Sequence, residues 1–205
     1  MDSTRAPDQL YRIVLTGGPG GGKTTAADLF RREIGSRVVL VPEAATIMFT
    51  GGFPRRREPD ALRAVQTAIF HVQRGIEDVQ SAAHPTRVLL CDRGTVDGSV
   101  YWPGPPEEFF DAMGTSLEQE LSRYGAVVFF ESAAAGGLEI NSGNPARTES
   151  VEEARELDRL LRAQWSKHPR FFLVPHSQSF FEKISMGLAI LQSLVAQMPS
   201  SPPPG

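Results

Sequence analysis

Cysteine, long apolar runs and excess positive charge are all scarce in this chain, and each absence excludes a class of protein. The single cysteine, Cys91, excludes an internal disulfide and the cysteine pairs of a zinc site or a small secreted scaffold. The net charge of −3 lacks the broad positive field that non-specific nucleic-acid binding requires. No apolar stretch approaches the roughly 20 residues that span a bilayer. We therefore expect neither nucleic acid as a main partner nor a transmembrane segment.

Two recognition patterns are also missing. The four histidines lack the spacing of metal ligands, so no metal is assigned to them. No Asn-Lys-x-Asp motif of the kind that reads guanine in Ras-like GTPases occurs, so the sequence leaves the choice between ATP and GTP open.

The two ends of the chain have the composition of flexible segments. Met1–Gln9 is polar and lacks the apolar region of a signal peptide, so we expect a cytoplasmic location. Ser200–Gly205 is rich in proline. Because 205 residues suit one domain, we expect a single domain over 11–198, a flexible start at 1–10 and a disordered tail at 199–205.

Five short runs of β-branched, aromatic and other apolar residues predict strands that are buried on both faces. The predicted strands are Arg12–Thr16, Val38–Val41, Val88–Cys91, Ala126–Phe130 and Phe171–Val174. Helical patterns lie between them, over Lys23–Ile34, Pro59–Ala83, pieces within Glu107–Ser122, Ser150–Lys167 and Ser179–Gln197. This alternation predicts a doubly wound α/β fold, with a five-stranded parallel sheet covered by helices on both faces.

The strongest motif follows the first predicted strand directly and precedes the first predicted helix. It reads Gly17-Gly18-Pro19-Gly20-Gly21-Gly22-Lys23-Thr24 and matches the P-loop pattern. Glycines let the loop turn its amide groups toward phosphate oxygens, and Lys23 adds a positive charge at the β- and γ-phosphates. The alternative is a Gly-rich turn with an incidental lysine. We expect ATP or GTP to contact Gly18, Gly20, Gly21, Gly22, Lys23, Thr24 and Thr25.

A carboxylate and an arginine end the third predicted strand. Asp92 stands where P-loop proteins place an acid beside Mg²⁺, so we expect Asp92 and the Thr24 hydroxyl to hold that ion. The alternative role for Asp92 is capping the following turn. Arg93 can reach a phosphate or substrate oxygen with its planar guanidinium, and its alternative is an ion pair with Asp92 or Asp97.

These motifs together resemble a known family. The stretch Ile13–Thr25, the run Val41–Ala45, Cys91–Thr95 with Asp97, and Asn144–Glu149 are similar to the AAA-type ATPases related to the NadR kinase domain. The nucleotide-binding half of the TRPL-translocation-defect proteins, described as binding GTP and phosphoinositides, looks related as well. The resemblance covers most of residues 11–175 and implies the fold of P-loop nucleoside and nucleotide kinases.

The resemblance also implies roles for two further residues. Nucleoside kinases carry a glutamate after the second strand as the base near the acceptor hydroxyl, and Glu43 matches it; the alternative is that Glu43 caps a helix starting near Ala44. Arg147, in a lid expected at about 133–148, matches the arginines that stabilise the transferred phosphoryl group. Such lids usually hold several arginines, whereas this segment has Arg147 alone.

Three further groups of residues each have two interpretations. Arg155, Arg159 and Arg162 share a helix face and either supply charge to the site or pair with Glu152 and Asp158. Arg55–Arg57 either receive an anion or are simply solvated. Tyr101 and Trp102 either cover an acceptor or pack on the core.

The function that fits these patterns best is a kinase-like phosphotransferase or ATPase that uses Mg²⁺ with ATP or GTP. Its acceptor, an unidentified small molecule, would bind in a cleft formed by residues 43–57 and 93–113. The alternative is a regulatory nucleotide-binding switch that acts on a protein or anionic-lipid partner. We expect a monomer or a homodimer.

Overall fold

The computed structural model describes residues 12–133 and 150–197. Within these residues, five strands form one parallel sheet: β1 (Arg12–Thr16), β2 (Val38–Val41), β3 (Val88–Asp92), β4 (Ala126–Phe130) and β5 (Phe171–Val174). Their order is β2-β3-β1-β4-β5. The carboxyl ends of the neighbouring strands β3, β1 and β4 therefore meet at one edge of the sheet, where ligands bind in open α/β folds.

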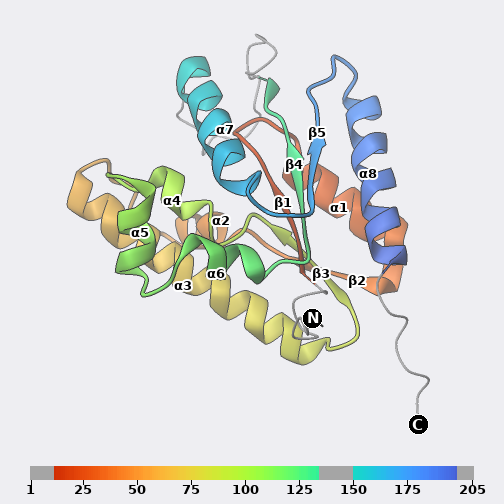
Figure 1. Ribbon diagram of the computed structural model, residues 1–205, viewed down its shortest axis with the longest axis horizontal. Coiled ribbons are helices and arrows are strands. Elements are labelled where there is room, and N and C mark those ends of the chain that lie inside the picture. Colours follow the sequence, from red (N-terminus) through yellow and green to blue (C-terminus); the bar gives the residue numbers. More distant parts are fainter. Residues whose placement is uncertain (1–11, 134–149, 198–205) are drawn as a thin grey trace.

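Helices fill the connections between the strands (Figure 1). The described helices are α1 (Lys23–Ile34), the 3₁₀ turn η2 (Gly35–Arg37), α2 (Ala44–Thr50), α3 (Pro59–Ala83), α4 (Gly98–Tyr101), α5 (Pro106–Ala112), α6 (Leu117–Ser122), α7 (Val151–Trp165) and α8 (Phe180–Ala196).

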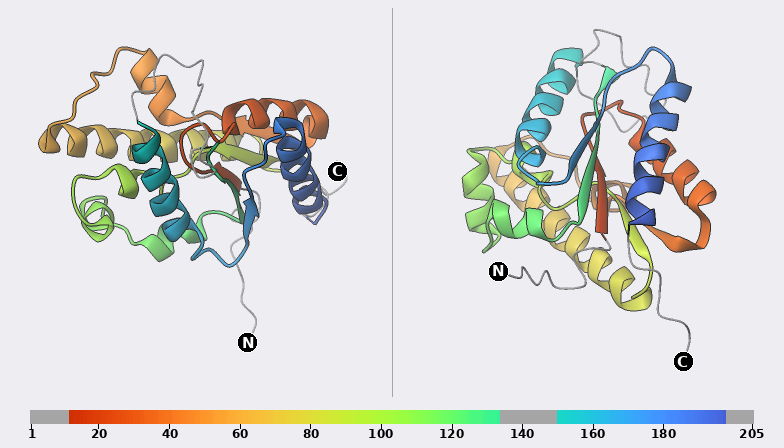
Figure 2. Two further views of the ribbon diagram at one scale, coloured as in Figure 1. Left: turned by 90° about the horizontal axis from the view of Figure 1, so that it is seen from above. Right: turned by 45° about the vertical axis from the view of Figure 1, so that its right-hand side comes forward.

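Two hydrophobic cores lie on opposite faces of the sheet. One face packs against α1 and α8, through Ile13 and Leu15 of β1 and Phe30 of α1. The opposite face packs against α3 to α7, through Val14 of β1 and Trp165 of α7. Figure 2 shows both helix layers from two sides. Because both faces are covered, β1, β3 and β4 are buried at every residue, which explains their unbroken apolar sequences.

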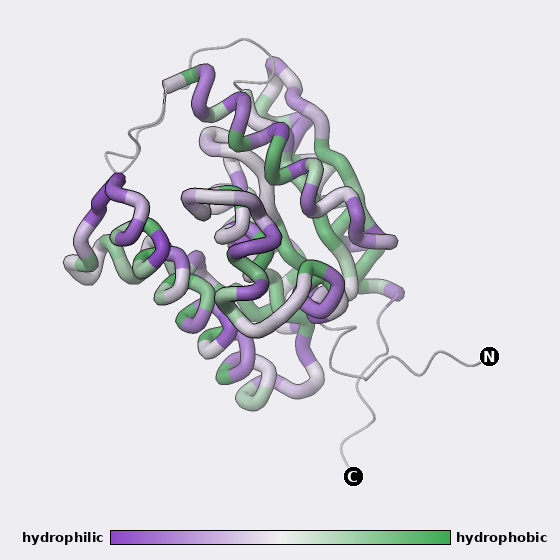
Figure 3. The backbone as a smooth tube through the Cα atoms, turned by 60° about the vertical axis from the view of Figure 1, so that its left-hand side comes forward, coloured by the Kyte–Doolittle hydropathy of each residue, from purple (hydrophilic) through white to green (hydrophobic). Residues whose placement is uncertain are grey.

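The hydropathy of the backbone follows the same layering. In Figure 3 the strands are largely hydrophobic, whereas the covering helices alternate between hydrophilic and hydrophobic positions. Helix α7, for example, buries Ala154, Asp158, Leu161 and Trp165 at intervals of three and four residues. No helix among the described residues is both long and apolar enough to cross a bilayer.

The predicted strands and long helices are confirmed to within two residues at each end, and the doubly wound fold is confirmed. Helix α4 was not predicted, and α2 was expected only in the alternative that Glu43 caps a helix starting near Ala44. Both are too short for the 3.6-residue periodicity to be recognised. The segments at 1–10 and 199–205, and the expected lid except Ala133, lie outside the described residues.

Candidate active site

The P-loop joins the carboxyl end of β1 to the first turn of α1. Gly22 has a left-handed backbone, with φ of 81°, and directly precedes Lys23, the first residue of α1. Gly17 has φ of 135°, and a Cβ there would lie 2.1 Å from the carbonyl oxygen of Phe130 at the end of β4. A side chain is excluded at both positions, because it would require a rare backbone conformation or collide with β4.

The amino end of α1 is left open to an anion. Helix α1 has no side-chain cap and no acidic residue in its first turn. In contrast, serine side chains cap α6, α7 and α8, and each of these helices carries glutamate in its first turn. The first backbone amides of a helix need an acceptor, and phosphate oxygens are a suitable one. The local sequence of α1 therefore fits a phosphate group at its amino end.

Lys23 lies buried beside this helix end. Its ammonium group donates a hydrogen bond to the Gly18 carbonyl at 2.8 Å, inside the P-loop itself. Burial and the positive charge of Arg93 lower the pKa of Lys23 to about 7, against the opposing charges of Asp92, Glu43 and Asp97. An anionic ligand would favour the charged form of this amine.

Asp92 and Thr24 lie side by side below the P-loop. The Thr24 hydroxyl donates to Asp92 Oδ2 at 2.9 Å, and Asp92 Oδ1 is buried without a hydrogen-bond partner among the described residues. An unpartnered buried carboxylate oxygen next to a hydroxyl fits a hard divalent cation, whose remaining ligands would be phosphate and water. The described residues contain no cluster of three or more acidic, His or Cys side chains that could hold a metal ion. Among residues 12–133 and 150–197, no backbone amide of the turn after β3 donates to the Asp92 carboxylate.

Arg93 bridges two carboxylates at the ends of β2 and β3. Its Nε lies 2.6 Å from Glu43 Oε1, and its Nη1 lies 2.8 Å from Asp97 Oδ1. The predicted ion pair between Arg93 and Asp97 is present. The second carboxylate that pairs with Arg93 is Glu43, and not the predicted alternative, Asp92. Arg93 has φ of 69°, an uncommon backbone conformation for a residue with a side chain.

Glu43 occupies the residue before α2, as its alternative reading expected, but its carboxylate does not cap the helix. It accepts a hydrogen bond from Thr46 and pairs with Arg93. Burial opposes its ionisation, but Arg93, Thr46 and Lys23 outweigh burial and hold the pKa of Glu43 below its usual value. Burial and the nearby charge of Glu43 instead raise the pKa of Asp92. The two carboxyl groups of the site thus differ in proton affinity.

The sequence analysis missed Gln73, which lies behind this charged group. Buried on α3, Gln73 accepts the Ala44 amide at 3.1 Å and donates to the Arg93 carbonyl at 3.4 Å and to Glu77 at 3.1 Å. It thus joins the chain next to Glu43 to the backbone of Arg93. A signal was present, since Gln73 and Glu77 stand on the same buried helical stripe as Phe70.

Asp158 of α7 was also missed as a site residue. One oxygen, Oδ1, accepts both the Gly18 amide at 2.8 Å and the Ser132 amide at 2.9 Å. A Cβ on Gly18 would lie 2.6 Å from this oxygen, so the P-loop packs directly on the Asp158 side chain. Its position among the apolar residues of the α7 stripe was the available signal.

The remaining predicted groups divide between site and surface. Arg159 pairs with Glu156 and Arg162 with Glu131, so these two arginines form surface ion pairs, although with other partners than Glu152 and Asp158. The Asp158 carboxylate accepts backbone amides instead. Trp102 is buried and stacks edge-on against Phe109, which supports packing over acceptor contact. Arg55–Arg57 are exposed, and Arg147 lies outside the described residues.

The strand order, the loop that opens α1 and the Thr24–Asp92 contact define a P-loop, kinase-like nucleotide-binding domain. The chain belongs to the AAA domain family, whose model matches residues 12–183. Among solved structures it is similar to shikimate kinase from Acinetobacter baumannii in complex with shikimate, with a TM-score of 0.54 and 17% identity over 93% of this chain and 96% of that chain. At that identity the likeness concerns the fold. No curated protein matches the chain.

Proposed function

We propose that the chain is a phosphotransferase that moves the γ-phosphoryl group of ATP or GTP to a hydroxyl group of a small molecule. The observation that carries this proposal is the pairing of Glu43 with Arg93 next to Lys23 and Asp92. A site that only bound nucleotide would need the P-loop and Asp92. Glu43 and Arg93 add a carboxylate and a cation at the ends of β2 and β3, on the acceptor side of such a fold.

The transfer step can be written with the groups of this site. The acceptor oxygen forms a bond to the γ-phosphorus while the bond from that phosphorus to the bridging oxygen breaks, and the nucleoside diphosphate leaves. The acceptor proton passes to Glu43. Glu43 remains ionised at neutral pH, because Arg93 and Thr46 stabilise its charge, so it can accept a hydrogen bond from the incoming hydroxyl.

The other side chains act by position and charge. Lys23 would neutralise the triphosphate, and Arg93 would exchange part of its pairing with Glu43 and Asp97 for an oxygen of the acceptor or the phosphoryl group. Thr24 and Asp92 would hold Mg²⁺, which when bound neutralises phosphate charge. Phosphoryl transfer depends mainly on positioning and electrostatics, and these side chains are of the types that supply both. Arg147 as a lid arginine stays a prediction.

The test is acceptor-dependent turnover. Consumption of ATP and GTP is measured with and without a panel of nucleosides, ribosides, other small alcohols and hydroxylated carboxylic acids, shikimate among them. The variants are Glu43→Gln and, as a matched control on an exposed glutamate of α6, Glu118→Gln. We expect one class of acceptor to accelerate the wild type and Glu118→Gln many-fold, to leave Glu43→Gln near its basal rate, and to yield a phosphorylated product.

The alternative reading makes a different prediction in the same assay. If no acceptor accelerates turnover, and hydrolysis instead rises with a protein partner or anionic lipid vesicles, the chain is a regulatory switch and the phosphotransferase proposal is wrong. If an acceptor is phosphorylated equally well by Glu43→Gln, the reaction class stands and the role of Glu43 is wrong.

A further inference from the structure

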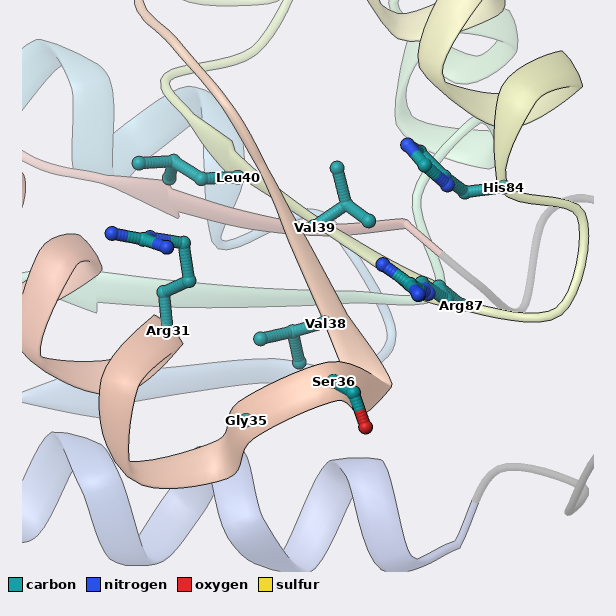
Figure 4. Close-up of a pocket in the computed structure, with 8 residues that line it drawn as sticks. All are labelled: Arg31, Gly35, Ser36, Val38, Val39, Leu40, His84 and Arg87. Carbon is teal, nitrogen blue, oxygen red and sulfur yellow. The ribbon is translucent and has the colours of Figure 1, made fainter.

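A hollow of about 550 Å³ lies along the outer edge of β2, away from the candidate active site (Figure 4). Strand β2 is the end strand of the sheet, and among the described strands it pairs only with β3. The lining residues come from the end of α1, the turn η2, β2 itself and the chain between α3 and β3: Arg31, Gly35, Ser36, Val38, Val39, Leu40, His84 and Arg87. The hollow thus follows a strand whose second edge is open to hydrogen bonding.

The charged groups of the hollow have one sign. Two arginines and one histidine line it, and none of its lining residues is acidic. Across residues 12–133 and 150–197, no ion pair involves Arg31, His84 or Arg87. This local excess of positive charge stands out in a chain whose net charge is −3.

The two arginines of the hollow, Arg31 and Arg87, lie on opposite sides of β2. In Figure 4, Arg31 and Leu40 lie on one side of the strand, and His84 and Arg87 lie on the other, beyond Val39. Side chains of an extended segment point alternately to the two sides of a sheet. A segment pairing with β2 would therefore bring successive side chains first toward Arg31 and then toward His84 and Arg87, with apolar contacts from Leu40 and Val39.

We propose that the open edge of β2 binds an extended acidic segment of a partner protein, which adds to the sheet as a further strand. Backbone hydrogen bonds to β2 supply the fixed geometry, and the cations on both sides select for acidic side chains. A second copy of the chain is a poorer occupant, because edge-to-edge pairing would bring two sets of these cations together. The chain's own residues 198–205 contain four prolines and no acid, so they cannot supply the ladder or the charge.

The experiment compares eight-residue fluorescent peptides by anisotropy. The first repeats Glu-Glu-Val-Val, so that glutamates point to both sides of the strand. The second repeats Lys-Lys-Val-Val, and the third is the Glu peptide N-methylated at alternate residues, which removes backbone donors. We expect the Glu peptide to bind, and both others to bind at least tenfold more weakly. Hydrogen exchange should slow at the amides of residues 38–41 when the Glu peptide is present.

Substitutions at Arg31 and Arg87 test whether the Glu peptide binds at the open edge of β2. Arg31→Glu/Arg87→Glu should weaken the Glu peptide at least tenfold, and Arg31→Gln/Arg87→Gln should weaken it less; the Gln pair keeps the test valid if the Glu pair unfolds. Arg63→Glu/Arg159→Glu makes the same charge change on a half-buried and an exposed arginine elsewhere and should leave binding unchanged. The proposal is wrong if the Glu peptide does not bind, if the Lys peptide binds equally well, if the control pair is affected as strongly, or if β2 is protected by self-association without peptide.

Discussion

The two halves of the candidate site differ in composition, because backbone groups form one half and charged side chains form the other. The phosphate half is backbone: glycines of the P-loop pack against the Phe130 carbonyl and the Asp158 carboxylate, which leaves no room for a Cβ. The half that we propose for the acceptor, called the acceptor half below, consists of side chains: Glu43, Arg93 and Asp97 form ion pairs with one another. Backbone geometry can be altered only by distorting the fold, whereas charged side chains can be exchanged one at a time.

The acceptor half depends on a buried polar network behind it. Glu77 is fully buried and accepts hydrogen bonds from Gln73, Tyr124 and Arg123. Buried charges persist only when their partners are well placed, so this network fixes α3 relative to the end of β3. Changes in the network should therefore reach the acceptor half and leave the phosphate half intact.

The largest effect should come from Lys23→Ala, on the phosphate half. Removing the charged partner of a desolvated anion costs about 2–4 kcal/mol, so affinity for ATP and GTP should fall steeply while the fold is kept. Titration of labelled nucleotides and thermal unfolding measure the two properties. Lys167→Ala, on an exposed lysine, is the control and should bind as the wild type does. Equal affinity in Lys23→Ala and the wild type would contradict the P-loop assignment.

Asp92→Asn and Glu43→Gln should separate the two halves. Asp92→Asn should reduce the Mg²⁺-dependent tightening of nucleotide binding by about 1.5–3 kcal/mol, the worth of hydrogen bonds and contacts to a charged group. Glu43→Gln should keep that tightening and slow turnover. Nucleotide titrations with Mg²⁺ and with a chelator, followed by turnover assays, measure both. If neither variant differs from the wild type, both carboxylates are structural.

A smaller effect on nucleotide affinity, although not on stability, is expected from Asp158→Ala, which leaves the buried amides of Gly18 and Ser132 without their acceptor. Unpaired buried amides cost about 1–3 kcal/mol each, so both stability and nucleotide affinity should decrease. Asp158→Asn keeps an acceptor oxygen and should recover part of the affinity. Urea unfolding and nucleotide titration provide the readouts. Loss of stability with unchanged affinity would reduce Asp158 to a packing role.

Gln73→Met should produce the converse pattern. The change keeps the side-chain volume but removes the acceptor of the Ala44 amide, so the Glu43–Arg93 geometry should loosen. We expect turnover to fall about tenfold with nucleotide affinity unchanged, an effect of about 1.4 kcal/mol on the barrier. Gln80→Met, on the same helix, is the control. A parallel loss of nucleotide affinity would mean that the two halves are not independent.

The smallest effect should be a proton taken up on nucleotide binding. In the free protein the pKa of Lys23 is about 7, and phosphate oxygens should raise it. Below pH 7 the amine is already charged, so the added uptake is small; above pH 7 binding must protonate it, and affinity should decrease as the pH rises. Calorimetry at pH 8 in buffers of different ionisation enthalpy measures the uptake. Lys23→Ala should lack it, and the same buffer dependence in both proteins would disprove the mechanism.

The difference between the halves also explains what the sequence could predict. The strands and the P-loop were predictable because apolar runs and glycine spacing are local patterns. Asp158 and Gln73 act across 140 and 29 residues of sequence, respectively, and only their place on apolar helical stripes marks them. The pairing of Glu43 with Arg93 depends on β2 and β3 being neighbours, which a sequence pattern does not specify. Helix α4 carries too few turns to be recognised, and the sequence indicated only the start of α2, near Ala44.

The left-handed backbone at Arg93 has a consequence for how this position can vary. Glycine adopts that conformation without strain, whereas a residue with a Cβ destabilises the fold by about 1–2 kcal/mol there. The chain nevertheless places at this point a long cation that contacts Glu43 and Asp97. The backbone conformation alone would favour glycine, whereas the two largely buried carboxylates favour a cation at this position. Arg93 thus marks a position where backbone conformation and side-chain charge have opposite preferences.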